Sequence, residues 1–251
     1  MTHIFLSPHL DDAVLSCGGM IYQLTQARQP VQVISIFAGD PPPGPLAPFA
    51  HSLHDRWAGT VADRRAEDIA SVTILGADAI HWPYPDAVYR RDPHTGAALY
   101  DSEGAIFGEV APADAHTLAS IAERLKAIDP AAQVYVPLTA GRHVDHQIVR
   151  AAAEALGREW VYYEDFPYVE TPAKLDAVLR DPAWRPEVIA LSDEAIRIKA
   201  HAIVAHRSQL STFFAGEEEV AQRIRAYANR VGGQARPAER VWRLPSVPRV
   251  L

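Results

Sequence analysis

The stretch Ile4-Phe5-Leu6-Ser7-Pro8-His9-Leu10-Asp11-Asp12 decides how this chain folds. It begins as a short apolar run, which is typical of a buried strand, and ends in an imidazole and two adjacent carboxylates. The charges of Asp11 and Asp12 repel each other, so each carboxylate raises the pKa of the other. A divalent cation would relieve this repulsion, because it accepts the imidazole and one carboxylate as ligands and leaves the second carboxylate free. The stretch therefore predicts a first strand with a metal site at its carboxyl end.

Downstream of this stretch, strands and helices alternate along the chain. Apolar and β-branched runs predict strands at residues 4–7, 31–37, 79–82, 133–137 and 160–163. The spacing of apolar residues predicts helices at residues 12–28, 63–75, 115–128, 146–156, 194–209 and 217–231. The proline-rich residues 40–50 predict a loop, residues 94–105 a hairpin or an irregular excursion, and residues 239–242 an ion-paired strand. This alternation predicts an α/β fold with a largely parallel sheet flanked by helices, at a length that suits one large domain.

The composition limits the function. Hydrophobic residues make up 48% of the 251 residues, which is enough for a real core. The formal net charge is -7 and no cluster of Lys and Arg stands out, so we expect no nucleic-acid partner. We see neither a leader segment nor an apolar run of membrane-span length, so we expect a cytoplasmic protein without membrane insertion. The single cysteine, Cys17, excludes an internal disulfide and lies in an apolar run, which predicts a buried structural role.

A second polar cluster, His143-Val144-Asp145-His146, follows the predicted strand at residues 133–137. The carboxyl ends of parallel strands lie at one edge of a sheet, so we expect this cluster to meet His9, Asp11 and Asp12. Asp145 could accept a hydrogen bond from one of the two downstream rings and fix its tautomer. If Asp11 were only a helix cap and the histidines were solvated, neither cluster would have a chemical role. Their occurrence at matched strand ends instead favours a catalytic metal site with mixed His/Asp ligands and one open position.

Together, Pro8-His9-Leu10-Asp11-Asp12, Gly18-Gly19 and the His143 cluster resemble the PIG-L/LmbE-like zinc-dependent deacetylases. The resemblance runs from the first strand to at least Tyr168. It implies a Rossmann-like fold and a single deacetylase domain over residues 1–251, with Zn²⁺ as the cofactor. It also implies hydrolysis of an N-acetyl or related N-acyl group on an amino-sugar-containing small molecule or glycoconjugate.

Carried over by position, the resemblance implies that His9, Asp12 and His146 are the zinc ligands. Asp11 matches the general base of the family. His143 matches the histidine that assists at the transition state, and we expect it to be protonated and oriented by Asp145.

The resemblance also implies substrate contacts. Arg64 matches the sugar-contacting arginine, with Arg65 as the alternative, and Asp86 matches the carboxylate that binds sugar hydroxyls. Some members have a tyrosine where this chain has Gly141, and Tyr168 is a candidate to replace it.

Two other functions fit parts of the pattern. Phosphoryl transfer through Asp11, with magnesium on Asp12, leaves both histidine clusters without a role. A noncatalytic metal- or sugar-binding module of the same fold would not require Asp11, which is surplus to metal ligation. The sequence leaves open whether the protein forms a homo-oligomer.

Overall fold

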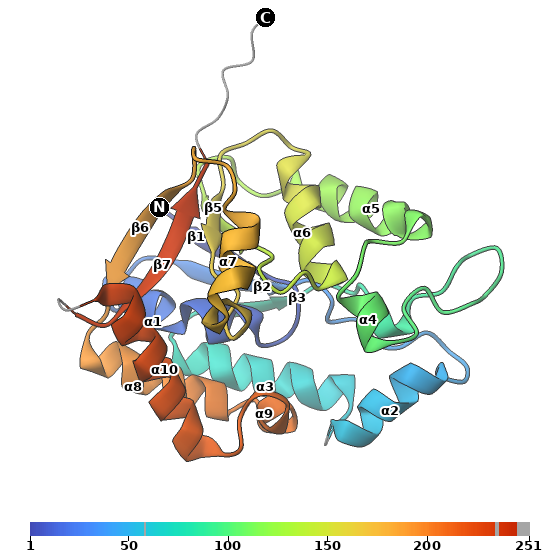
Figure 1. Cartoon of the computed structure of the whole chain (residues 1–251), viewed down its shortest axis with the longest axis horizontal. Helices are drawn as coiled ribbons and strands as arrows, with labels where there is room; N and C mark the ends of the chain where they lie inside the picture. The colour runs from blue at the N-terminus through green and yellow to red at the C-terminus, as the bar shows by residue number, and fades with distance from the viewer. Residues whose placement is uncertain (58, 234–235, 245–251) are drawn as a thin grey trace, which may run out of the picture.

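The computed structural model describes residues 1–57, 59–233 and 236–244, and its strands form one seven-stranded sheet (Figure 1). Their order across the sheet is β3-β2-β1-β4-β5-β7-β6. The strands are β1 (His3–Ser7), β2 (Val31–Ser35), β3 (Asp78–His81), β4 (Gln133–Pro137), β5 (Val161–Tyr163), β6 (Arg185–Ala190) and β7 (Ala238–Arg243). Strands β1 to β5 run parallel to one another, whereas β7 is antiparallel to both β5 and β6. The predicted α/β fold with a largely parallel sheet is thereby confirmed.

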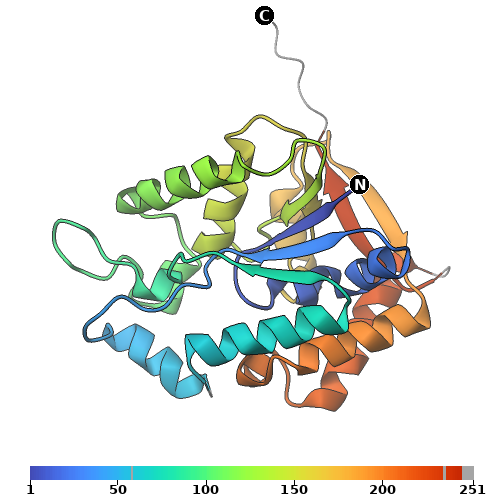
Figure 2. The ribbon, with the colours of Figure 1, turned by 180° about the vertical axis from the view of Figure 1, so that it is seen from behind.

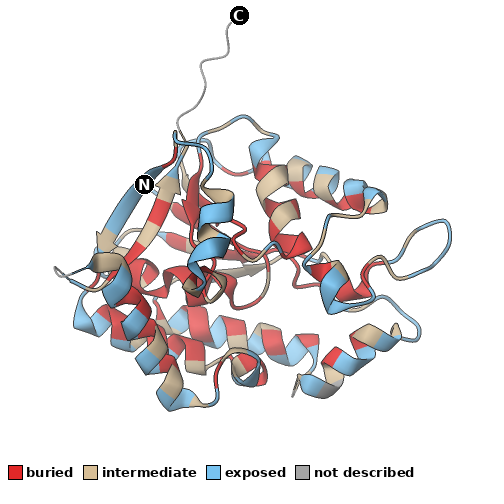
Figure 3. Cartoon of the chain, in the orientation of Figure 1, coloured by how far each residue is buried: buried red, intermediate tan, exposed pale blue. Residues whose placement is uncertain are grey.

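Helices cover both faces of the sheet (Figures 1 and 2). One face packs against α1 (Asp12–Gln26), α3 (Val61–Ile74) and α10 (Glu217–Gly232), and α8 (Asp193–Val204) packs on these helices. The other face packs against α5 (Ala115–Leu125) and α6 (Val144–Glu154). The shorter helices are α2 (Pro48–Arg56), α4 (Glu103–Ile106), α7 (Pro172–Val178) and α9 (Arg207–Phe213). Figure 3 shows that the buried residues concentrate on the sheet and on the helix sides that face it. Among the described helices we find none with the length and apolar character that a bilayer crossing requires.

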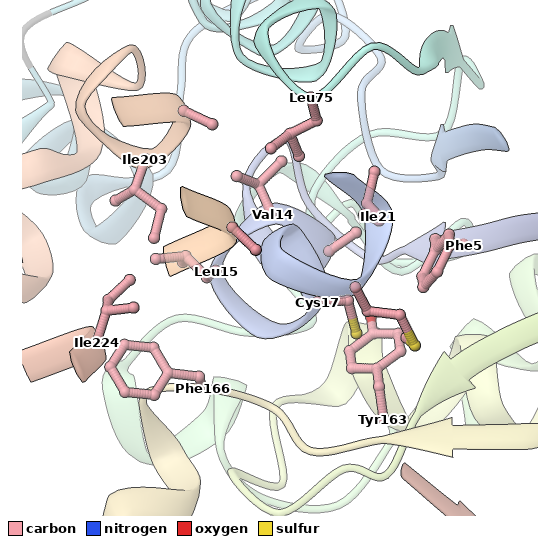
Figure 4. Close-up of a cluster of buried hydrophobic side chains, with 14 of the residues drawn as sticks. Phe5, Val14, Leu15, Cys17, Ile21, Leu75, Tyr163, Phe166, Ile203 and Ile224 are labelled. Atoms are coloured by element: carbon pink, nitrogen blue, oxygen red, sulfur yellow. The ribbon is translucent and has the colours of Figure 1, made fainter. Parts of the chain in front are cut away.

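Helix α1 lies at the centre of the larger core. Figure 4 shows Val14, Leu15 and Ile21 of this helix pointing in different directions into their apolar surroundings. Cys17 is buried, as the sequence predicts, and burial raises the pKa of its thiol well above its usual range. The thiol therefore stays protonated and packs as a small apolar group.

Several element boundaries differ from the sequence prediction. The predicted loop at residues 40–50 runs into α2, which begins at Pro48. Helix α3 begins at Val61 because Thr60 and Asp63 form a capping box. The predicted helix at residues 194–209 is two helices, since α8 ends at Val204 and α9 begins after His206.

Strand β6 and helix α7 are also absent from the sequence prediction. Strand β6 is an edge strand with mostly exposed residues, so it lacks the alternating burial pattern of a strand. Helix α7 has only seven residues and none of them is buried, so it is too short to give a clear helical pattern. By contrast, the ion-paired strand predicted at residues 239–242 is present as β7, where Glu239 pairs with Lys199.

The sheet places the two polar clusters next to each other. Strand order proceeds through β1, β2 and β3 in one direction and from β4 to β5 in the other, so it reverses between β1 and β4. Loops that leave such a switch point in opposite directions open a crevice beyond the carboxyl ends of the strands, where ligands bind in α/β proteins. The loop after β1 carries His9, and the loop after β4 ends at His143.

Candidate metal centre and active site

Three predicted ligands converge at this crevice. The Asp12 carboxylate oxygen Oδ2 lies 3.0 Å from Nδ1 of His9 and 3.2 Å from Nε2 of His146. The last contact is close enough for an ion pair but is not aligned as a hydrogen bond, so this buried Nε2 has no hydrogen-bond partner among the described residues. One ligand atom from each residue lies within 4.8 Å of the others. An orphaned imidazole nitrogen facing a carboxylate and a second imidazole fits a divalent metal ion.

Each of the two imidazole rings, His9 and His146, contacts a further carboxylate through its second nitrogen. Asp165 lies two residues after the end of β5, and its Oδ1 is 2.6 Å from Nδ1 of His146. Asp145 Oδ2 lies 3.0 Å from Nε2 of His9. Such outer carboxylates fix the tautomer of a metal-binding imidazole and raise its basicity. The expectation that Asp145 orients His143 or His146 is therefore wrong, because its carboxylate contacts the ring of His9.

A buried arginine anchors Asp145. Arg90 donates to Asp145 Oδ1 over 2.6 Å and to Asp114 over 2.8 Å, and Tyr100 also donates to Asp114. Arg90 holds the pKa of Asp145 well below its usual range even though burial acts in the opposite direction. The backbone N–H of Ala87 donates a further bond to Asp145. His9, His143 and Asp145 form a second group that could hold a metal. We disfavour this group, because Arg90 and Ala87 already donate hydrogen bonds to the Asp145 carboxylate.

Asp11 remains available beside the metal-binding group. It occupies the N-cap position of α1, yet its side chain makes no capping hydrogen bond. Ser7 Oγ accepts the backbone N–H of Ala13 instead. Burial and, next, the charge of Asp12 raise the pKa of Asp11 to about 6. The side chain lines the cleft, so the interpretation of Asp11 as a simple helix cap does not hold.

His143 caps α6 with its ring. Its Nδ1 accepts the backbone N–H of Asp145 over 3.2 Å, so in the neutral ring the proton resides on Nε2. Burial and the neighbouring His9 hold the pKa of His143 well below its usual range. The structure therefore favours a neutral N–H donor, in place of the protonated ring that we expected from the sequence.

The cleft beside the metal-binding group has a volume of about 220 Å³. Arg64 lines it, stacks on Trp57 at 4.8 Å, and leaves its buried Nε without a hydrogen-bond partner among the described residues. Arg65 instead donates to the Ala38 carbonyl and to Asp40, so the structure places only Arg64 in the cleft.

Asp86 and Tyr168 also line the cleft. One oxygen of Asp86 accepts the N–H of Val88, and the other lies 3.7 Å from Nε2 of His9. The Tyr168 ring occupies the space that a side chain at position 141 would fill, since a Cβ on Gly141 would lie 2.5 Å from Tyr168 Cγ.

Sequence reasoning missed several contributors to the site. Asp165 follows a predicted strand at the correct sheet edge, so the strand-end rule that selected His143 could have found it. Arg90 lies in an irregular segment without periodicity, and we find no sequence signal for it. Gln209, in a polar stretch at the start of α9, lines the cleft as well.

A parallel α/β sheet that carries a mixed His/Asp metal-binding group and a free buried carboxylate at its switch point defines a metal-dependent hydrolase. The family model described as PIG-L: GlcNAc-PI de-N-acetylase matches residues 4–156. The chain belongs to the PIG-L family, which confirms the resemblance found in its sequence.

Individual relatives agree with this assignment. A 2'-N-acetylparomamine deacetylase from Niallia circulans is 28% identical over an alignment of 236 residues, which covers 86% of this chain and 83% of that protein. The crystal structure of a zinc-inhibited form of teicoplanin deacetylase matches with a TM-score of 0.84 and 27% identity, over 99% of this chain and 100% of that chain. An N,N'-diacetylchitobiose deacetylase from Pyrococcus horikoshii shares the fold, with a TM-score of 0.55 and 17% identity over 98% of this chain and 84% of that one. With its family and deacetylase relatives, the chain is a hydrolytic N-deacetylase, as the sequence predicts.

Proposed function

We propose that the protein is a zinc-dependent hydrolase that removes an N-acetyl or related N-acyl group from an amino-sugar-containing small molecule. One observation carries this proposal: two groups share one cleft with the metal-binding group. They are the buried Asp11 carboxylate, which makes no capping hydrogen bond, and the Arg64 guanidinium, whose Nε has no hydrogen-bond partner among the described residues. The relatives named for paromamine and teicoplanin support an amino-sugar conjugate as the substrate.

His9, Asp12 and His146 would hold the zinc ion. When bound, zinc polarises the amide carbonyl and lowers the pKa of water towards about 7. The donor set suits this metal, because imidazole and carboxylate are its usual catalytic ligands. Asp145 and Asp165 then keep two of the rings oriented from behind.

The residues around the metal would carry the proton transfers. Asp11 accepts a proton from the attacking water as the new C–O bond forms, which makes it the general base. His143 donates its Nε2–H to the oxygen that gains negative charge, a contribution of roughly 3 kcal/mol for one such donor. The C–N bond then breaks, and the proton held by Asp11 passes to the departing amine. Tyr168 is a second candidate donor to the oxygen that gains negative charge, since it lines the cleft and its ring lies 6.0 Å from the ring of His146.

Arg64 and Asp86 would recognise the sugar. Arg64 offers its Nε–H, which has no hydrogen-bond partner among the described residues, and Asp86 offers an acceptor oxygen beside His9. A cleft of about 220 Å³ is smaller than most drug-sized ligand pockets, so it suits one sugar residue, with the rest of the conjugate outside.

A noncatalytic binding module explains less of the site. Asp11 would then be a buried carboxylate without a ligand role or a capping role. The single-domain organisation, the cytoplasmic location and a homo-oligomeric state stay predictions.

The test combines metal analysis with acetate release. We expect one zinc per wild-type chain and release of acetate from N-acetylglucosaminides, with zinc supplied at one equivalent so that excess metal does not inhibit. His146→Ala should lose most of the metal. Arg64→Ala should keep the metal but lower kcat/KM, because a desolvated polar partner is worth about 1–3 kcal/mol. Full zinc occupancy in His146→Ala would refute the ligand assignment, and wild-type kinetics in Arg64→Ala would refute the substrate contact.

A further inference from the structure

A second concave surface adjoins the active-site cleft. It is a groove of about 540 Å³ between the loop after β4 and helix α7. Its apolar floor includes Ala173, Ala177 and Val178, and its described lining contains three cationic side chains: Arg142, Lys174 and Arg180. The reaction proposed above uses none of these cations.

An aromatic pair separates the groove from the cleft. Phe107 lines both cavities, and its ring lies 5.3 Å from the ring of His143 and 5.9 Å from that of Tyr168. Lys174 Nζ lies over the ring of Tyr168, 5.4 Å from its centroid. The groove is thus one aromatic ring away from the groups that act on the amide. A substituent on a sugar bound in the cleft can reach it by passing over Phe107, which is 38% exposed.

The charge of the groove is opposite to that of the chain. The protein carries a formal net charge of -7, yet no carboxylate belongs to the described lining of this groove. Arg142 forms an ion pair with Glu109, whereas Lys174 and Arg180 have no ion pair with any described residue. Cations gathered around one concave surface produce a positive local potential that attracts anions and repels cations.

The loop that presents Arg142 is held in an unusual conformation. Thr139 and Arg142 both have left-handed backbones, with φ of 67° and 59°. The N–H of Arg142 donates to the Thr139 carbonyl, and Asp165 accepts the N–H of Ala140. Asp165 therefore ties the wall of the groove to the His146 ring of the metal centre.

We propose that this basic groove binds an anionic group, a carboxylate or a phosphate, carried by the aglycone of the amino-sugar substrate. The inference rests on the proposed function, because it assumes that the amino sugar occupies the cleft. The groove would select among conjugates: Lys174 and Arg180 would strengthen the binding of an anionic aglycone and repel a polycationic one.

Two nearly isosteric probes test the proposal: the 4-carboxyphenyl and the 4-carbamoylphenyl glycosides of N-acetylglucosamine. They differ in charge, so the ratio of their kcat/KM values for acetate release isolates the effect of the groove. We expect the wild-type enzyme to prefer the carboxylate probe. In the double variant Lys174→Gln/Arg180→Gln, the ratio of the two kcat/KM values should fall by roughly threefold to tenfold, which is the effect of one or two partly exposed ion pairs. The kcat/KM for the neutral probe should not change, and added salt should weaken the preference in the wild type.

Lys126→Gln is the matched control. It removes one exposed cation next to α5, beyond the opposite end of β4, and should leave the preference intact. Equal kcat/KM for both probes in the wild type would overturn the groove assignment and leave the deacetylase function standing. Inhibition of both probes alike by inorganic phosphate, without a preference between them, would indicate a site for free anions and would also overturn it. If neither probe releases acetate, the proposed function fails on these N-acetylglucosaminides, and the inference fails with it.

Discussion

At the scale of single residues, the position of one side chain fixes what its neighbours can do. Gly141 leaves the space that the Tyr168 ring fills, so a larger residue at 141 and this placement of Tyr168 exclude each other. His143 accepts a backbone N–H at Nδ1, which directs its proton to Nε2. Asp11 has the N-cap position but not the capping bond, and its carboxylate stays available for chemistry.

The pH dependence of the reaction should report on Asp11. A general base acts only when deprotonated, so kcat/KM should fall as the pH drops through the pKa of Asp11. Burial raises this pKa to about 6, and a bound cation lowers it, so we expect the acidic limb at or below about pH 6. Asp11→Asn should keep the metal, lose this limb and lower the rate by roughly 10²-fold or more. Profiles of kcat/KM against pH, with zinc measured in both proteins, check this expectation; a variant with full metal and full rate would exclude Asp11 as the base.

At the scale of elements, α1 is held by a buried ion pair from two distant segments. Glu239 of β7 accepts the N–H groups of Gly19 and Met20, and it pairs with Lys199 of α8 over 2.7 Å. The two glycines of α1 permit this approach. A Cβ on Gly18 would lie 2.9 Å from Lys199 Cγ.

Gly19→Ala should destabilise the protein through this packing. The new Cβ would lie 2.6 Å from Leu191 Cδ1 and 3.1 Å from a carboxylate oxygen of Glu239, and overpacking of this kind typically costs about 1–3 kcal/mol. The control is Gly104→Ala in α4, where the new Cβ would have no described atom within 4 Å apart from its own helix backbone and chain neighbours. This variant should be neutral or stabilising. Urea unfolding of the three proteins measures the difference. Equal stability of Gly19→Ala and the wild type would show that Leu191 and Glu239 adapt without loss.

At the scale of the whole molecule, the site is assembled from segments that are far apart in sequence. The loop after β1 supplies His9, the first turns of α1 and α6 supply Asp12 and His146, and the segment after β5 supplies Asp165. The irregular segment between β3 and α5 contributes Arg90 and Asp114, which hold Asp145 against His9. The metal centre and this segment are therefore parts of one buried hydrogen-bonded network.

Arg90→Met should weaken both the fold and the metal centre. It leaves Asp114 and Asp145 buried without their cation, a change that typically costs about 3–5 kcal/mol. Loss of the support behind His9 should weaken zinc binding by roughly 10–100-fold in the folded protein. Arg90→Lys should restore part of both losses, whereas Arg124→Met, which removes an exposed stacking contact with Trp82, should change little. Chelator competition and chemical unfolding measure the two effects; wild-type zinc affinity in Arg90→Met would show that Asp145 needs no anchor.

The sequence by itself determined the parallel sheet and the meeting of the two polar clusters. Apolar runs define the central strands locally, and parallel strands place their carboxyl ends at one edge, so His9, Asp12 and His146 could be brought together without coordinates. The sequence favoured Arg64 and kept Arg65 as the alternative. The structure separates the two, because adjacent helical residues point in different directions and only Arg64 lines the cleft.

Only the tertiary structure decided which groups support the site. The partner of Asp145 is His9, which lies 136 residues away, and no local pattern distinguishes that ring from those of His143 and His146. Arg90 lies in a segment without helical or strand periodicity, and the edge strand β6 has mostly exposed residues, so neither leaves a local signal. Local patterns record which face of an element is buried, whereas hydrogen bonds between buried charges depend on where the folded chain brings distant segments together.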